Sequence, residues 1–113
     1  MTFSIAARDP ETGAVGVAVQ SKFVSVGAVV PFVSADAGAV ATQSFANVAY
    51  GPDGLDLLRE GHTAESTIEE LTDGDDEAQS RQVGVVGLDG EPAAFTGADG
   101  FDVAGDRQGE HYT

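Results

Sequence analysis

The chain has 113 residues and carries 19 acidic side chains against 5 basic ones, which gives a formal net charge of −14. So few cations cannot form the basic patch that nucleic-acid binding needs, and no segment approaches the ~20 apolar residues of a membrane-spanning helix. The absence of cysteine excludes disulfides, thiolate metal sites and a cysteine nucleophile.

The length predicts a single domain over residues 1–113, and a hydrophobic content of 42% is enough for a core. An acidic surface almost free of lysine is typical of halophilic proteins, so the charge indicates a salt-rich source and not a substrate. Arg8 and Asp9 interrupt the N-terminus before any long apolar segment, which argues against a signal peptide and predicts a cytoplasmic protein.

The first part of the chain predicts a β-hairpin. Residues 3–7 are a short apolar segment, and residues 9–13 contain the proline and glycine of a tight turn. Residues 15–19 are β-branched at every second position, which is the periodicity of a strand. When such a hairpin folds back on itself, its two far ends meet.

That geometry places Thr2 beside Ser21 and Lys22. A small second residue favours removal of Met1, which would leave Thr2 with both a hydroxyl and a free α-amine of pKa ~8. The amine can act as the base for the hydroxyl, and a nearby ammonium would lower the pKa of the amine. The simpler alternative is a threonine that merely follows the start methionine, with a solvated lysine nearby.

The next segments predict further strands. Residues 24–33 are apolar, and because Pro31 has no N–H, this strand is bent, lies at a sheet edge or ends there. Asp36 lies in the following turn, where capping is its expected role. Residues 39–44 predict another strand of small residues. Strands this close together in sequence predict an antiparallel meander.

Helices are expected in the middle of the chain. Residues 47–54 predict a loop, residues 55–61 a short helix, and Thr63 the N-cap of a second helix. The apolar positions of that second helix, within residues 64–71, follow an i, i+4, i+7 pattern. Residues 73–77 are acidic but lack the ligand spacing of a calcium loop, so they predict a solvated turn.

Strands return near the C-terminus. Residues 83–88 and 92–96 flank an Asp-Gly pair, which is a strong hairpin signal, whereas the tail at 97–113 has no apolar segment and is expected to be unanchored. This order predicts an α+β fold of antiparallel sheets and helices, with too little helix to cover two sheets. His62 and His111 lie far apart without ligand spacing, so a metal site is not expected.

Four stretches of the sequence resemble one known family: residues 2–32, 38–61, 81–97 and, more weakly, 104–112. The family is domain of unknown function 1028, which is related to the N-terminal-nucleophile (Ntn) hydrolases. The resemblance implies an αββα sandwich. Family members are about twice as long as this chain, which implies a fold that is incomplete here, either because the chain is a fragment or because it completes its core as a homo-oligomer.

The resemblance also implies a set of site residues. Thr2 matches the nucleophile, while Ser21 and Lys22 occupy the hairpin end where related enzymes place polar and cationic groups. The region after the next strand would supply oxyanion donors and line the substrate cleft. Its candidates for substrate binding are Gln43, Ser44 and Asn47.

The leading hypothesis is therefore a hydrolase of a small-molecule or peptide amide, in which Thr2 attacks the carbonyl and water releases the acyl group. It needs no cofactor, nucleic acid or membrane. The alternative is a catalytically silent, Ntn-like binding or assembly module, which the apparent truncation and the lack of an acidic partner for Lys22 favour. A third reading is a gene product that does not fold alone.

Overall fold

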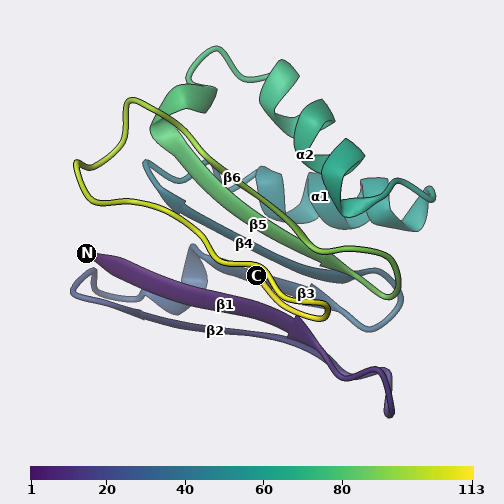
Figure 1. Cartoon of the computed structure of the whole chain (residues 1–113). Coiled ribbons are helices and arrows are strands. Elements are labelled where there is room, and N and C mark those ends of the chain that lie inside the picture. Colours follow the sequence, from purple (N-terminus) through teal and green to yellow (C-terminus); the bar gives the residue numbers. More distant parts are fainter.

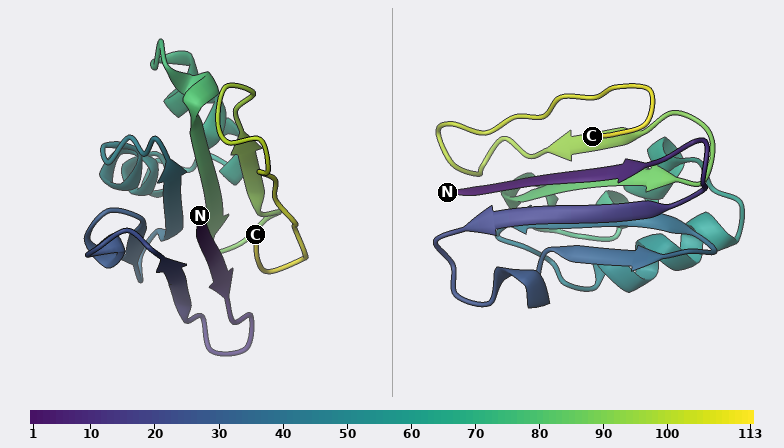
Figure 2. Two further views of the ribbon diagram at one scale, coloured as in Figure 1. Left: turned by 90° about the vertical axis from the view of Figure 1, so that its left-hand side faces the viewer. Right: turned by 90° about the horizontal axis from the view of Figure 1, so that it is seen from below.

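The computed structural model describes residues 1–113, which form three layers (Figure 1). Two helices cover one face of a four-stranded sheet, and a two-stranded hairpin packs on the other face (Figure 2). The predicted α+β class with antiparallel sheets is confirmed. The elements in chain order are β1 (Thr2–Arg8), β2 (Val15–Ser21), a short 3₁₀ turn (Val26–Ala28), β3 (Pro31–Ser34), β4 (Gly38–Ser44), α1 (Tyr50–Arg59), α2 (Ala64–Asp73), a second 3₁₀ turn (Ala78–Ser80), β5 (Arg81–Gly87) and β6 (Ala93–Thr96).

The predicted N-terminal hairpin is present. β1 and β2 pair antiparallel from Thr2 opposite Ser21 to Arg8 opposite Val15. In the turn, the Asp9 carboxylate accepts hydrogen bonds from the Glu11 backbone N–H and the Thr12 hydroxyl, and Gly13 adopts a φ of 75°. The turn is therefore stabilised locally, and its conformation sets the register of the whole hairpin.

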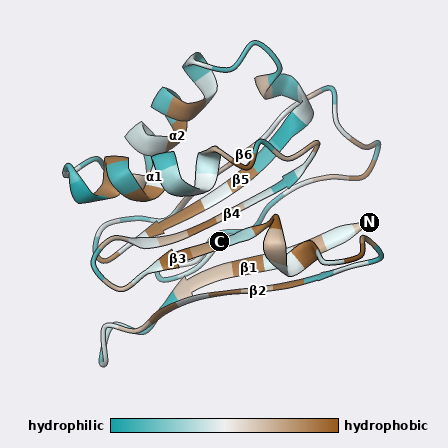
Figure 3. Ribbon diagram, turned by 180° about the vertical axis from the view of Figure 1, so that it is seen from behind, coloured by the Kyte–Doolittle hydropathy of each residue, from teal (hydrophilic) through white to brown (hydrophobic).

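The two layers of strands share a core of small and β-branched side chains. Ala6 from the hairpin is fully buried against residues of the larger sheet such as Ala39 and Val86. A second core lies between the larger sheet and the helices, around Val40 and Val85. Strands carry much of the hydrophobic colour in Figure 3, whereas the helices alternate hydrophobic and hydrophilic segments. No helix is long and apolar enough to cross a membrane.

The predicted meander is wrong, because β2 does not pair with β3. The 3₁₀ turn at Val26–Ala28 carries the chain from the hairpin to the other sheet, and Val30 is buried between the two layers. Pro31 then begins β3, an edge strand, as its missing N–H allows. The apolar segment is thus a crossing between layers, which hydrophobicity alone does not distinguish from a strand.

Helix α1 begins at Tyr50, inside the predicted loop. Gly51 and Pro52 occupy its first turn, where backbone N–H groups have no intrahelical acceptor and a proline is tolerated. A Cβ at Gly51 would lie 2.1 Å from the Phe32 ring, so this glycine allows close packing of the helix on β3. These residues resemble a loop in sequence because a packing requirement selects them.

Helix α2 has the predicted N-cap. The Thr63 hydroxyl accepts a hydrogen bond from the Ser66 backbone N–H at 3.1 Å. We expect Thr63→Ala to lower the free energy of unfolding by about 1 kcal/mol, because the first turn loses its side-chain acceptor. Urea denaturation measures this loss, and Thr63→Ser should preserve most of the stability. Equal stability of the alanine and serine variants would contradict the capping role.

The C-terminal tail is anchored, contrary to expectation. Ala6 and Thr113 exchange backbone hydrogen bonds of 2.9 and 3.0 Å, and the Arg8 backbone N–H donates to the His111 carbonyl at 2.9 Å. The Arg8 guanidinium also donates to His111 Nδ1 at 3.2 Å. Figure 1 shows the end of the tail beside β1. The hydrophobic pattern did not indicate this contact, because the free edge of β1 offers backbone groups to any sequence.

Candidate functional site

The hairpin brings two hydroxyl groups together at the start of the chain. The Oγ atoms of Thr2 and Ser21 lie 2.9 Å apart. Ser21 also accepts a hydrogen bond from the Phe23 backbone N–H at 3.0 Å. Both residues are half-buried on the inner side of the hairpin. The predicted proximity of Thr2 and Ser21 is therefore present, with Met1 still preceding Thr2 in the structure.

Lys22 directly follows Ser21 and is exposed. It forms no ion pair with any carboxylate of the chain. The only lysine of this acidic protein thus carries an uncompensated charge, one residue beyond the Ser21 hydroxyl. Its electrostatic effect on Thr2 stays a prediction.

Gln43 reaches this site from β4. Alternate residues of β4 face opposite layers, and Ala39 and Ala41 pack toward the hairpin, so Gln43 does too. Its Nε2 donates to the Thr2 carbonyl at 3.4 Å, and its Oε1 accepts from the Ser4 hydroxyl at 2.7 Å. Ser4 is a further residue of this site, and its two-residue spacing from Thr2 in sequence already places both on the same strand face.

Ser44 ends β4 with a φ of 73°, in the left-handed region that serine rarely adopts. Such a conformation costs on the order of 1–3 kcal/mol and is common at functional sites. The next residue, Phe45, stacks on Phe101 with ring centroids 5.7 Å apart, and both rings are more than half exposed. The end of β4 therefore adds a strained serine and an exposed aromatic pair after Gln43.

Asn47 does not join this group. Its side chain lies on the helix side of β4, where Nδ2 donates to Asp75 at 3.3 Å and Oδ1 accepts from the Ala49 backbone N–H at 3.1 Å. The Thr42 hydroxyl donates to the Asn47 carbonyl from the same side. The structure thus brings Thr2, Ser21 and Gln43 together, with Lys22 and Ser44 next to them in sequence, and places Asn47 elsewhere.

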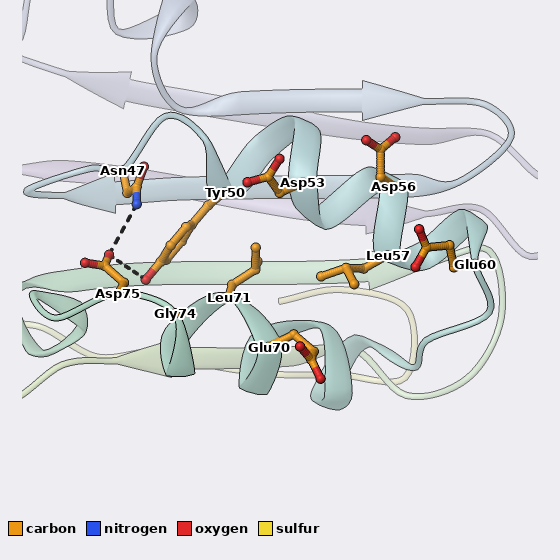
Figure 4. Close-up of a pocket in the computed structure, with 10 residues that line it drawn as sticks. All are labelled: Asn47, Tyr50, Asp53, Asp56, Leu57, Glu60, Glu70, Leu71, Gly74 and Asp75. Carbon is orange, nitrogen blue, oxygen red and sulfur yellow. Dashed lines mark hydrogen bonds between the residues drawn. The ribbon is translucent and has the colours of Figure 1, made fainter.

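A second polar cluster surrounds Asp75 (Figure 4). The Asp75 carboxylate accepts hydrogen bonds from Tyr50 Oη at 2.8 Å and Arg81 Nε at 3.0 Å. The side chains of Asp75 and Arg81 are only 10% and 13% exposed. The hydrogen bond from Arg81 lowers the pKa of Asp75 well below its ordinary value. Burial, and after it the hydrogen bond to the Asp75 carboxylate, raises the pKa of the Tyr50 phenol.

The interpretation of residues 73–77 as a solvated turn holds for the other four residues, which are exposed, but not for Asp75. The Asp75 side chain is largely shielded because Arg81, six residues later, compensates its charge, and a partner supplied by another element leaves no local pattern. The pocket beside it measures about 370 Å³ and lies between α1 and α2. Its carboxylate-bearing lining residues are Asp53, Asp56, Glu60, Glu70 and Asp75. No three acidic or histidine side chains of the chain are grouped to hold a metal ion.

The remaining polar candidates have structural partners. Asp36 accepts from the Ser34 hydroxyl within its turn and pairs with Arg59 at 3.0 Å, which lowers the pKa of Asp36 to about 2. His62 Nδ1 lies 3.1 Å from the Ser66 hydroxyl. The turn role expected for Asp36 is thus present, together with an ion pair.

Comparison with known proteins identifies relatives of the whole chain. The model of a family of unknown function, DUF1028, matches residues 2–113. The fold is similar to the crystal structure of protein SPO2555 from Silicibacter pomeroyi, assigned to the same family, with a TM-score of 0.94 and 35% sequence identity. The match covers 98% of this chain and 52% of that one, so the chain spans about half the length of this relative. No curated protein matches the sequence.

Proposed function

Because the chain belongs to the DUF1028 family, whose function is unknown, we propose an activity from its site: hydrolysis of an amide bond through Thr2, as in Ntn hydrolases. The observation that carries this proposal is the 2.9 Å contact between the Thr2 and Ser21 hydroxyls at the start of β1. The contact fixes the orientation of the Thr2 hydroxyl, and Thr2 becomes the N-terminal residue once Met1 is removed. It also holds that hydroxyl beside a second hydroxyl and one residue away from an unpaired lysine.

The proposed reaction begins after removal of Met1, which frees the α-amine of Thr2. The amine accepts the proton of the Thr2 hydroxyl as its oxygen attacks the amide carbonyl carbon. The tetrahedral intermediate collapses, the C–N bond breaks, and the leaving nitrogen takes the proton. Water then hydrolyses the acyl-threonine ester, which releases the acid and restores Thr2. This scheme requires no cofactor.

Neighbouring residues have separate roles in the proposal. Ser21 orients the Thr2 hydroxyl through their shared hydrogen bond. Lys22 stabilises the negative charge that develops on oxygen, because its ammonium has no carboxylate partner. Ser44 contributes to the substrate surface at the end of β4. The substrate is a small-molecule or peptide amide.

A second candidate function is assembly with another copy of the chain. The outward face of the hairpin includes Phe3 at 70% and Ile5 at 40% exposure, together with Ala18 and Gln20. None of these is charged, although the chain carries a net charge of −14. Two such faces could meet without bringing like charges into contact, and that burial would complete the incomplete Ntn-like sandwich that the resemblance implies.

A short N-terminal extension distinguishes the two functions. We expect a chain that begins at Thr2 to form one covalent adduct with a β-lactone acyl donor in molar salt, detected by intact mass. A chain extended by two residues should form none, because Thr2 no longer has a free α-amine. Its oligomeric state, measured by light scattering, should be unchanged. Equal labelling of both chains would overturn the hydrolase, and a monomer at all concentrations would overturn the assembly module.

A further inference from the structure

A series of side-chain hydrogen bonds, here called the amide relay, leads from the start of β1 into the four-stranded sheet. Its first link is the Ser4 hydroxyl, which donates to Gln43 Oε1 at 2.7 Å. Gln43 Nε2 in turn donates to Gln82 Oε1 on β5 at 2.5 Å. Gln82 Nε2 then donates to the Thr96 hydroxyl on β6 at 2.9 Å.

This series of hydrogen bonds ends at the carboxylate of Asp106. The Thr96 hydroxyl donates to Asp106 Oδ2 at 3.3 Å, and Gln82 Nε2 makes a second bond to the Gly105 carbonyl at 2.9 Å. The relay therefore joins the first strand to Gly105 and Asp106 of the tail. It contains residues of β1, β4, β5, β6 and the tail, and β1 and β4 are distant in sequence from the other three.

The terminal carboxylate determines the direction of every bond. An ionised carboxylate only accepts, so Thr96 must donate to Asp106 and can then accept only from the amide nitrogen of Gln82. The Gln82 oxygen therefore faces Gln43, which must present its own nitrogen there and its oxygen to Ser4. Bonds that point the same way polarise one another, which makes such a network stiffer than its separate parts.

This arrangement engages both ends of the Gln43 amide within the protein. Its oxygen is occupied by Ser4, and its nitrogen is occupied by Gln82 and by the Thr2 carbonyl at 3.4 Å. Gln43 thus touches β1 at two points, two residues apart, from a partly buried position. Both ends of its amide are bonded within the protein, and the substrate contact expected from the sequence stays a prediction.

We propose that Gln43 and Gln82 are positioning residues for the Thr2 nucleophile. Held by Thr96 and Asp106, the two amides fix the peptide group after Thr2, so that the hydroxyl keeps its orientation toward Ser21. This inference rests on the proposed hydrolase for its catalytic consequence. The attachment of the N-terminus is measurable without any activity.

The test uses Gln43→Met and Gln82→Met in the chain that begins at Thr2. Methionine has a similar size and no charge, so neither substitution changes the electrostatics of the Thr2 amine. The matched control is Gln79→Met, on the second 3₁₀ turn, an exposed glutamine that accepts a hydrogen bond from the Ala98 backbone N–H at 3.0 Å. Two quantities are compared well below the melting temperature: the ¹⁵N order parameter of the Phe3 amide, and the rate of Thr2 acylation by the β-lactone as a function of pH.

We expect the Phe3 order parameter to fall from about 0.85 toward 0.6 in both relay variants. The maximal acylation rate should fall about ten-fold or more, with an unchanged pH midpoint, because the nucleophile is misplaced and not differently charged. Gln79→Met should leave both quantities as in the wild type. If Gln43→Met does not fold, Ser4→Ala removes one of its partners and should lower the order parameter in the same direction.

Other outcomes separate the two proposals. An unchanged Phe3 order parameter in Gln43→Met would overturn the positioning role, whatever the acylation rate. A lower melting temperature with a wild-type maximal rate would also overturn it, because the relay would then contribute stability alone. The third outcome is a wild type that never labels at Thr2, together with a lower Phe3 order parameter in Gln43→Met. It would overturn the hydrolase but keep Gln43 as the residue that holds the N-terminus.

Discussion

Thr2→Ala is expected to abolish acylation of the chain, lowering its rate by at least about 10³-fold. The variant keeps the N-terminal amine but has no hydroxyl to attack a carbonyl, so the ester adduct cannot form and the amine-assisted attack by oxygen is lost. Because Thr2 is only half-buried at a strand end, the fold should tolerate the change. Time-resolved intact mass with a β-lactone in molar salt measures the rate.

Two further variants make this result specific. Thr2→Ser keeps a hydroxyl next to the amine and should still form the adduct. Thr72→Ala removes a threonine hydroxyl on α2, where it donates to the Ile68 carbonyl at 2.8 Å, and should label like the wild type. An adduct that forms equally fast on Thr2→Ala would contradict a threonine nucleophile and shift the interpretation to the assembly module.

Asp75→Asn is expected to lower the free energy of unfolding at pH 7 by about 3 kcal/mol. The substitution leaves the Arg81 guanidinium, which is 13% exposed, without its buried carboxylate partner. Glu77, at 2.7 Å, compensates only from the surface, where its side chain is 75% exposed. Chemical denaturation measures the loss, and Asp76→Asn, at the exposed neighbouring position, should cost much less. Equal effects of the two substitutions would contradict the structural role of the ion pair.

The same ion pair predicts a dependence of stability on pH. Arg81 lowers the pKa of Asp75 in the folded protein, so the unfolded chain binds a proton at this site more readily than the folded one. The resulting stability is present above the unfolded pKa of about 3.9 and is lost as pH falls toward the folded value. Between pH 5 and pH 2, roughly the range in which carboxylates titrate, the wild type should lose more stability than Asp75→Asn. Parallel curves would contradict this assignment.

Local patterns predict those parts of the molecule whose structure depends on neighbours in sequence. The turn at residues 9–13 and the strand periodicity around it predict a hairpin that brings Thr2 beside Ser21 and Lys22, and the observed register places Thr2 opposite Ser21. Thr63 caps α2 through a group three residues away. The Asp-Gly pair at 89–90 joins β5 to β6, with Gly90 at a φ of 72°. In each case the turn residues, the alternation of apolar and polar side chains, or the capping residue acts over a few positions, so the sequence reveals it without knowledge of the fold.

Packing between layers determines the rest of the candidate site. Gln43 meets Ser4 and Gln82 across 39 residues of sequence each, and the tail reaches Ala6 across more than a hundred positions. The Asp75 side chain is only 10% exposed because the fold presents Arg81 and Tyr50 to it. A glutamine or an aspartate has the same local preferences whether it is solvated or paired, so its sequence surroundings do not reveal its partner. The amino-acid sequence by itself therefore specifies the hairpin and the residues at its open end, whereas the association of the sheets and helices supplies the amide relay and the shielded ion pair, since both require polar groups from different elements to meet.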